Sequence, residues 1–211
     1  LVIDQVNNAG GSVFYLYSLA SLLTEQALYT PKHRMKITQE DVTNAQNSLA
    51  ALTAVKSENE AKKIWGETTS GYFISYEFAK FAMEYFRFII SEWEAGRTFT
   101  NPSHLYGVDK INPSPLVRYT KPLILLVNEL DFSGGDFFPT IMQDNKRATI
   151  IGTQTAGAGG YVNSVTYPNN LGIESIRLTG SIAERINKKP IENLGVKPDI
   201  KYEFSAVDYQ T

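Results

Sequence analysis

Ser133 lies where a serine can act as a nucleophile. It follows an apolar run of strand length and precedes Gly134 and Gly135 at the expected start of a helix. A serine hydroxyl needs a base to take its proton, and the oxyanion that it forms needs fixed N–H donors. The first turn of a helix supplies free N–H groups and the positive end of the helix dipole. Taken alone, however, the position favours an N-cap, because serine is among the commonest N-cap residues.

A second feature is the turn that contains Gly10 and Gly11, between an expected strand and an expected helix. Two glycines allow a positive φ and bring bare N–H groups to the carboxyl end of the strand. Taken alone, a plain tight turn is the better explanation, and the G-x-G-x-x-G fingerprint of dinucleotide-binding folds is absent. The glycine-rich stretch at 157–160 lacks the Gly-Lys-Ser/Thr ending of a phosphate-binding loop, so we exclude a P-loop.

The remaining candidates for chemistry are one carboxylate and two histidines. Glu192 lies in a turn-like, otherwise apolar stretch, although most glutamates are solvated surface groups. His33 and His104 are the two histidines of the chain, and we interpret both as packed or surface residues. Cysteine is absent, which excludes a cysteine nucleophile, disulfides and thiolate zinc sites. The sequence implies no metal and no cofactor.

The composition is that of one compact, folded domain. The 211 residues are 43% hydrophobic and 20% charged, which excludes a disordered chain. The formal net charge of −2 gives no basic field that would favour nucleic-acid binding. No stretch reaches the about 18 consecutive apolar residues of a membrane span, and the first residues show no signal peptide. Because the chain opens inside an expected buried strand, we expect a C-terminal piece of a longer protein.

The order of the expected elements indicates an α/β fold built from βα units. A helix is expected at 12–23, apolar on nearly every side and therefore buried. A second helix is expected from 137 to about 145, in which Pro139 removes one N–H. The expected strands are apolar runs bounded by turn residues, at 1–6, 122–127 and 148–152, with a hairpin of 161–167 and 173–178.

The section from about 38 to 96 has a different, helical character. Thr38 with Asp41 is typical of a helix start, and apolar residues follow at i+3 and i+4 spacing. A shorter helical pattern covers 58–65, and a strong one begins at Ser75. We interpret residues from about 38 to 96 as a helical insert that covers one edge of the sheet.

Four segments of the chain, taken in order, resemble the tail-specific, C-terminal-processing serine protease family, whose fold is of the ClpP/crotonase type. The segments are Asp-Gln-Val-Asn-Asn-Ala-Gly-Gly at 4–11, Phe-Ser-Gly-Gly-Asp-Phe at 132–137, Gly-Thr-Gln-Thr-Ala-Gly-Ala-Gly at 152–159 and Glu-Asn-Leu-Gly-Val-Lys-Pro at 192–198. In the family, the third segment usually carries a lysine that acts as the general base. Ala158 stands at that position here, so a Ser–Lys dyad is not carried over. The chain is similar instead to a branch, with chlamydial members, that uses a Ser-His-Glu arrangement.

The resemblance implies a role for each matched residue. The matches are Ser133 as the nucleophile, Glu192 as the carboxylate that orients the histidine, and Gly134, Gly10 and Gly11 as oxyanion-hole donors. The catalytic histidine of the family lies upstream of the first segment, outside this chain, and His33 does not match it. Without a base, general-base assistance of about 10²- to 10⁴-fold is lost. We therefore expect the chain on its own to be inactive, or nearly so.

The resemblance thus predicts that residues 1–211 are the C-terminal catalytic core of a serine endopeptidase that cleaves peptide bonds by acyl transfer. The implied partners are polypeptide substrates, the N-terminal part of the parent protein and, as in relatives, a second copy in a homodimer. Export is usual in the family, which predicts a secreted or periplasmic protein.

Two other functions are compatible with the same fold class. A non-catalytic module that binds apolar ligands or peptides would not need Ser133, Gly134 and Glu192 together, so their joint presence favours chemistry. An acyl-CoA hydratase of the crotonase class fits less well, because it needs no serine at a helix start and the sequence shows no nucleotide site.

Overall fold

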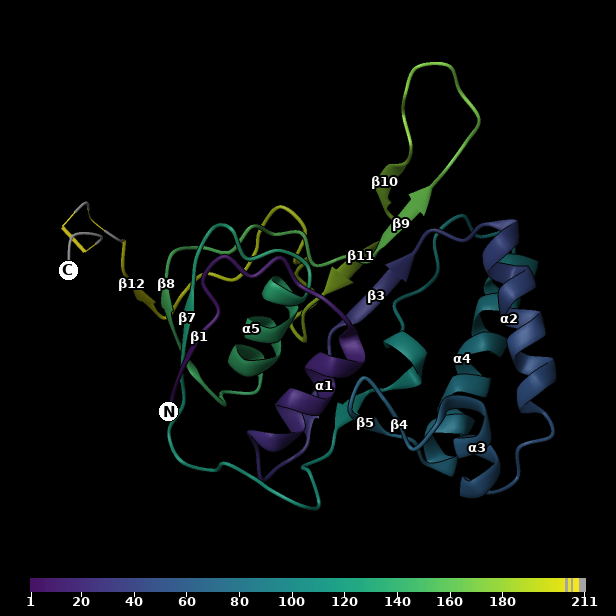
Figure 1. Cartoon of the computed structure of the whole chain (residues 1–211), viewed down its shortest axis with the longest axis horizontal. Coiled ribbons are helices and arrows are strands. Elements are labelled where there is room, and N and C mark those ends of the chain that lie inside the picture. Colours follow the sequence, from purple (N-terminus) through teal and green to yellow (C-terminus); the bar gives the residue numbers. More distant parts are fainter. Residues whose placement is uncertain (204, 206, 209–211) are drawn as a thin grey trace.

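A four-stranded parallel sheet forms the centre of the α/β part of the molecule (Figure 1). The structure, a computed structural model, describes residues 1–203, 205, 207 and 208. In their order across the sheet, the strands are β1 (Val2–Asp4), β7 (Ile124–Val127), β8 (Thr149–Gly152) and β12 (Ile200–Lys201). The continuous apolar run of β7 buries Leu125 and Val127 completely, which explains why this strand lies inside the sheet. The predicted α/β class is confirmed.

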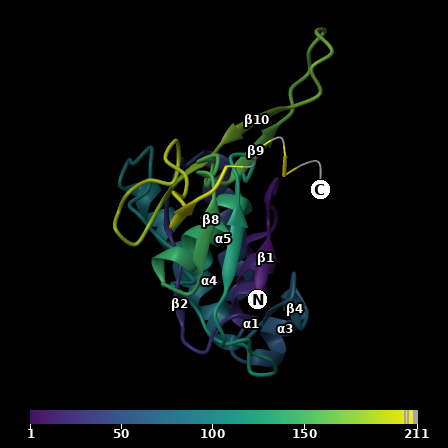
Figure 2. The same cartoon turned by 90° about the vertical axis from the view of Figure 1, so that its left-hand side faces the viewer.

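Parallel pairing brings the turns after β1 and β7 to the same edge of the sheet. Asp4, the last residue of β1, pairs with Leu126 of β7. β1 leads through its turn into α1 (Val13–Leu22), and β7 leads into α5 (Gly134–Asp144). The two helices pack against each other, and Figure 2 shows α5 lying along the sheet. The carboxyl ends of parallel strands are the usual position of a ligand site in α/β proteins.

α1 is less buried than its sequence predicts. Leu16, Tyr17 and Ala20 are buried, but Tyr15 is 62% exposed. The inner side of α1 contacts α5 and the short strand β5 (Tyr72–Phe73), and its outer side faces solvent. The expectation of a helix buried on nearly every side was wrong, because single apolar residues are common on protein surfaces and do not require a partner.

Pro139 lies inside α5, and a neighbouring side chain compensates for its missing N–H. In a regular helix that N–H would bond to the carbonyl of Gly135, four residues earlier. The Gly135 carbonyl accepts instead from Gln5 Nε2 at 2.8 Å. Gln5 follows β1 directly, so this bond ties the end of β1 to the first turn of α5.

Three helices occupy the section for which a helical insert was predicted. They are α2 (Gln39–Leu52), α3 (Glu58–Trp65) and α4 (Tyr76–Glu94). The cap of α2 is the predicted one, because Thr38 Oγ1 accepts from the Asp41 N–H while Asp41 accepts from the Thr38 N–H. Ser57 and Ser75 cap the other two helices in the same way. These local signals explain why the helix starts could be predicted closely.

The helical section has an apolar cluster beside the main core. α2 packs on α4, and Figure 1 shows the pair on the side of the molecule away from the four-stranded sheet. The expectation that this section covers one edge of that sheet was therefore wrong. The buried members of this cluster are Met35, Ile37, Val42, Ala45, Tyr85 and Ile89. Met35 is the last residue of the strand β3 (Lys32–Met35), and Ile37 lies just after it. His33 of the same strand packs on Phe137 of the main core, so β3 lies between the two clusters.

Short antiparallel ladders complete the fold. They are β2 (Leu28–Tyr29) with β6 (Lys110–Ile111), β4 (Thr68–Thr69) with β5, and β3 (Lys32–Met35) with β11 (Ser181–Glu184). The predicted hairpin is confirmed as β9 (Val162–Val165) paired with β10 (Ile176–Thr179), and it projects from the body in both views (Figures 1 and 2). Among the described residues, every helix is too short or too polar to span a membrane.

Candidate active site

Ser133 occupies the N-cap position of α5 but does not act as a cap. Its hydroxyl makes no capping hydrogen bond, and its backbone has φ +55° and ψ −113°. A non-glycine residue in such a conformation costs about 1–3 kcal/mol, and the cost persists only where the surroundings impose it. The Ser133 N–H donates to the carbonyl of Ala158 at 3.0 Å, which holds the turn in place. The N-cap interpretation therefore does not explain this serine, whose hydroxyl remains available.

The turn after β1 lies directly against Ser133. A Cβ added to Gly10, which has φ +89°, would lie 2.7 Å from Ser133 Cβ and 2.6 Å from the Gly134 nitrogen. A Cβ on Gly134 would in turn lie 3.1 Å from the Gly11 nitrogen. Only glycines allow the two turns to approach this closely. The structure thus brings together Ser133, Gly134, Gly10 and Gly11, the residues to which the resemblance gives a common site.

Two backbone N–H groups at this contact are free to bind a ligand. The Gly10 N–H donates to Asn8 Oδ1 at 2.8 Å and is therefore already used. The N–H groups of Gly11 and Gly134 donate to no acceptor among the described residues. A pair of adjacent free amides at the start of a helix is the arrangement that binds an oxyanion.

Asp131 fixes the β1 turn to the β7 turn. Its side chain is fully buried, and it accepts from the Asn8 N–H at 2.8 Å, the Asn128 N–H at 2.9 Å and Gln5 Nε2 at 3.1 Å. Burial raises the pKa of the Asp131 carboxyl, and the three donors act in the opposite direction. This carboxylate positions the glycine turns without lining the cavity beside them.

Asp136, in the first turn of α5, fixes the glycine-rich loop at 157–160 to that helix. Its two oxygens accept from Thr155 Oγ1 at 2.5 Å, the Gly157 N–H at 2.8 Å and the Ala158 N–H at 2.8 Å. Because Ala158 also accepts from Ser133, the loop is held at both ends against the serine. Sequence reasoning did not single out Asp136, although an acidic residue in a first helical turn beside two glycines was a usable signal.

Glu192 is half-buried and keeps one oxygen without a partner. Its Oε2 accepts from the Ala183 N–H at 2.8 Å, whereas its buried Oε1 has no hydrogen-bond partner. Oε1 lies against Gly160, where an added Cβ would be 2.9 Å from it. Burial, with a smaller contribution from the charge of Asp136, raises the pKa of the Glu192 carboxyl. A free, desolvated carboxylate oxygen can orient an imidazole by accepting its N–H.

The loop at 157–160 connects Glu192 to Ser133. Ala158 bonds to Ser133, and Gly160, two residues later, contacts Glu192. Ser133 lines the neighbouring cavity, but Glu192 is not among the residues that line it. The two side chains thus flank one short loop.

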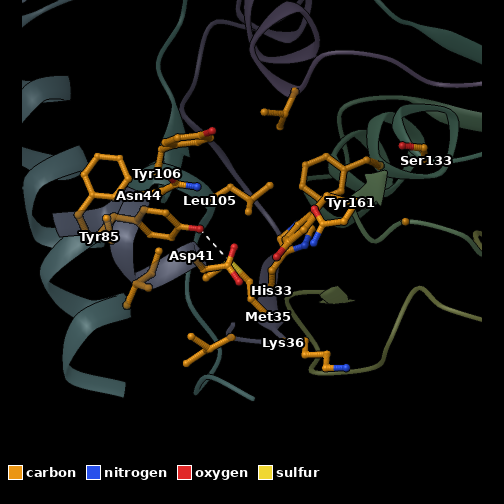
Figure 3. Close-up of a pocket in the computed structure, with 18 of the residues that line it drawn as sticks. His33, Met35, Lys36, Asp41, Asn44, Tyr85, Leu105, Tyr106, Ser133 and Tyr161 are labelled. Carbon is orange, nitrogen blue, oxygen red and sulfur yellow. Dashed lines mark hydrogen bonds between the residues drawn. The ribbon is translucent and has the colours of Figure 1, made fainter. Parts of the chain in front are cut away.

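A cavity of about 440 Å³ opens beside Ser133, Gly134 and Gly11. In Figure 3 its labelled lining residues extend from Ser133 on one side, through Tyr161 and His33, to Asp41 and Tyr85 on the other. Its largest apolar walls are the side chains of Leu16, Tyr85, Phe86, Ile89, Leu105, Tyr106, Phe137 and Tyr161. A volume of this order and mostly apolar walls are typical of sites that bind a small molecule or a side chain.

Among the described residues, neither histidine is hydrogen-bonded to Ser133. His33 is 2% exposed, and its Nδ1 lies 3.1 Å from Ser181 Oγ, while burial lowers the pKa of its imidazole to about 3. His104 is half-buried, and its Nδ1 lies 2.8 Å from Thr30 Oγ1. The prediction that both are packed or surface residues agrees with these positions. The described residues also contain no group of three acidic, histidine or cysteine side chains that is arranged to hold a metal.

Comparison with known proteins gives matches over almost the whole chain. A model of peptidase family S41 matches residues 1–202. A protein of Chlamydia muridarum is 46% identical over 209 residues, which are 99% of this chain and 35% of that protein. A protein of Chlamydia trachomatis is 45% identical over 209 residues, again 35% of its length. The chain therefore spans about one third of the length of these relatives.

Solved structures give the same result. The crystal structure of mature CPAF, the chlamydial protease-like activity factor, superposes with a TM-score of 0.94 and 45% identity, covering 99% of this chain and 40% of that one. A photosystem II D1 C-terminal processing protease, at 15% identity and a TM-score of 0.50, shares the fold alone.

Proposed function

The chain belongs to peptidase family S41, and from that premise we propose that it carries the nucleophile and the oxyanion hole of a serine endopeptidase. The observation that carries the proposal is the state of Ser133, which is strained, caps nothing and faces a cavity beside two free amide N–H groups. The sequence relationship to CPAF supports a protease that acts on polypeptides.

The proposed reaction is acyl transfer. Ser133 Oγ attacks the carbonyl carbon of a peptide bond, and the N–H groups of Gly11 and Gly134 stabilise the resulting oxyanion. Gly10 does not donate to the oxyanion, because its own N–H is bound to Asn8. Its role is to allow the β1 turn to lie close to Ser133 and Gly134. The proton of Ser133 passes to a histidine and then to the leaving amine, which leaves an acyl-serine that water hydrolyses. Glu192 Oε1 accepts the other N–H of that histidine.

The histidine of this mechanism is not one of the two in the chain. The low pKa of His33 makes its imidazole a weak base at neutral pH, and its Nδ1 is engaged with Ser181. The unpartnered Oε1 of Glu192 supports an imidazole supplied by another part of the full-length protein. We therefore propose that the 211 residues alone are inactive or nearly so, and that an N-terminal part of the parent completes the site.

Further parts of the proposal rest on the family alone. They are a homodimeric assembly and a secreted or periplasmic location. The alternative, a non-catalytic module that binds apolar ligands, draws support from the apolar cavity but leaves the conformation of Ser133 unexplained.

The test compares the full-length protein with its Ser133→Ala variant on an unfolded protein substrate. We expect at least about 10³-fold slower hydrolysis, because removing the nucleophile disables the whole catalytic unit. Ser164→Ala, at an exposed position of β9, is the matched control and keeps full activity. Equal hydrolysis by the wild type and by Ser133→Ala would refute the proposal.

A further inference from the structure

His33 lines the cavity beside Ser133 and carries a buried ring nitrogen without a partner. It lies on an inward position of β3, is 2% exposed and lines the cavity. Its Nε2 is buried and has no hydrogen-bond partner. Buried polar side-chain atoms in proteins are nearly always paired, so an unpaired one on a residue that lines a cavity indicates a missing partner.

The neighbours of His33 assign its Nε2 as a donor. Ser181 Oγ accepts from the Tyr161 N–H at 3.0 Å and lies 3.1 Å from His33 Nδ1. Nδ1 of His33 is the only acceptor within reach of the Ser181 hydroxyl hydrogen among the described residues, so we assign that hydrogen to Nδ1 and the proton of the neutral imidazole to Nε2. The ring is also packed against Phe137 on α5, with their centroids 5.3 Å apart, so its orientation is fixed.

The rest of the cavity favours a neutral, ring-sized group. Tyr85, Tyr106 and Tyr161 are among its mostly apolar walls. Asp41 also lines it and contributes a negative charge, which disfavours a carboxylate. The other charged lining residue, Lys36, is exposed, and in Figure 3 its amine points away from Asp41 and Tyr85.

We propose that this cavity binds a substrate side chain next to the scissile bond and that His33 determines its specificity, selecting a large side chain with a neutral hydrogen-bond acceptor, above all tyrosine. The inference rests on the proposed function, because it is Ser133 at the mouth of the cavity that makes the ligand a substrate. The tyrosine ring packs against the aromatic walls, and its hydroxyl oxygen accepts from His33 Nε2–H. Phenylalanine fills the same space but leaves that buried donor unpaired, which makes it the poorer substrate.

The first test measures kcat/KM of the full-length protein on two peptides that differ only in tyrosine or phenylalanine at the cleavage position. We expect the tyrosine peptide to be preferred by about 5- to 100-fold, the range expected for one buried donor left unpaired. His33→Phe keeps a ring against Phe137 but has no donor, so the ratio falls towards one. His33→Gln carries an amide donor and restores part of the preference for tyrosine. The control His104→Gln lies outside the cavity and leaves the wild-type ratio unchanged. A ratio near one in the wild type, or the wild-type ratio in His33→Phe, would overturn the inference.

A second test separates this inference from the proposed function, because it needs no catalysis. The Ser133→Ala full-length protein is labelled with ¹⁵N-histidine and titrated with N-acetyl-tyrosine amide and, separately, N-acetyl-phenylalanine amide. We expect the His33 Nε2–H resonance to shift with the tyrosine compound and to respond much less to the phenylalanine compound. Equal responses refute the role of His33 even if Ser133 proves to be the nucleophile. If the variant gives a tyrosine-selective response but the wild-type protein hydrolyses no peptide, the pocket and its donor are retained and the substrate assignment is refuted.

Discussion

Gly10→Ala tests whether the contact between the two glycine turns builds the site. The new Cβ would lie 2.6 Å from the Gly134 nitrogen, 2.7 Å from the Phe132 oxygen and 2.7 Å from Ser133 Cβ. These contacts are with backbone atoms and with the first side-chain carbon of Ser133, so no flexible side chain can move aside. The φ of +89° adds strain that glycine does not have. Together, overpacking and strain are expected to lower the free energy of unfolding by about 2–5 kcal/mol.

The same substitution is expected to reduce catalysis more than stability alone explains. If the β1 turn moves away to relieve the contact, the N–H groups of Gly11 and Gly134 no longer converge on one oxyanion. A displacement of about 1 Å costs about 10²-fold in rate. The assay is kcat/KM of the full-length protein on an unfolded protein substrate, measured with urea unfolding on the same samples.

Gly172→Ala is the control that isolates backbone strain from the contact. Gly172 has φ +72°, and a Cβ there would meet no atom within 4 Å. It is expected to cost at most about 1–2 kcal/mol of stability and to leave kcat/KM unchanged. If Gly10→Ala behaves like Gly172→Ala in both measurements, the argument that the glycine contact positions Ser133 is wrong.

Three further predictions follow from the same geometry. Glu192→Gln keeps the side-chain shape but removes a charged acceptor, so kcat of the full-length protein should fall by about 10²- to 10⁴-fold. The control Glu184→Gln on β11 should keep the wild-type kcat. Equal kcat values for Glu192→Gln and the wild type would exclude a role for Glu192. Asp136→Asn leaves N–H donors of the glycine-rich loop unpaired and should lower the free energy of unfolding, measured by urea titration, by about 3 kcal/mol. A change below about 0.5 kcal/mol, which is the usual scatter of surface substitutions, would contradict this prediction. Burial lowers the pKa of His33 from 6.5 to about 3, so the unfolded state binds more protons between those values. The stability that His33 contributes is present above that window and should fall by up to about 1.4 kcal/mol per pH unit as the pH drops through it; an unchanged slope in His33→Phe would refute this assignment.

Local signals made much of the fold predictable. Thr38 and Asp41 form a capping box whose interactions span three residues, so the start of α2 could be read from the sequence. The run at 122–127 became a buried central strand because every residue in it is apolar or proline. The degree of burial of α1 could not be read in the same way. Whether Tyr15 meets a partner depends on which elements fold against that helix, and the helix sequence does not contain that information.

Some features of the candidate site could also be predicted from the sequence, and others could not. The closeness of Ser133 to the glycines of the β1 turn was expected from the resemblance alone, and the parallel pairing of β1 with β7 explains it by placing both turns at one sheet edge. Two hydrogen bonds of the site depend on loop conformations that residue types do not fix. They are the bond from the Gly10 N–H to Asn8 and the bond from the Gly157 N–H to Asp136. The histidine prediction was limited in the same way. The interpretation of His33 as a packed residue agrees with its burial, but an unpartnered nitrogen becomes visible only when the whole cavity is built.

The unpaired polar atoms link the two proposals. Among the described residues, three buried side-chain atoms have no hydrogen-bond partner: Tyr17 Oη, His33 Nε2 and Glu192 Oε1. The latter two are joined through one residue of β11, since Ala183 pairs with His33 in the ladder and donates its N–H to Glu192. Our two proposals assign a group from outside the chain to each of these two atoms, an imidazole N–H to Glu192 and a substrate oxygen to His33. If those groups bind, both atoms become paired while the ladder between them keeps its hydrogen bonds. The binding of substrate and the completion of the catalytic unit would then need no rearrangement of β11.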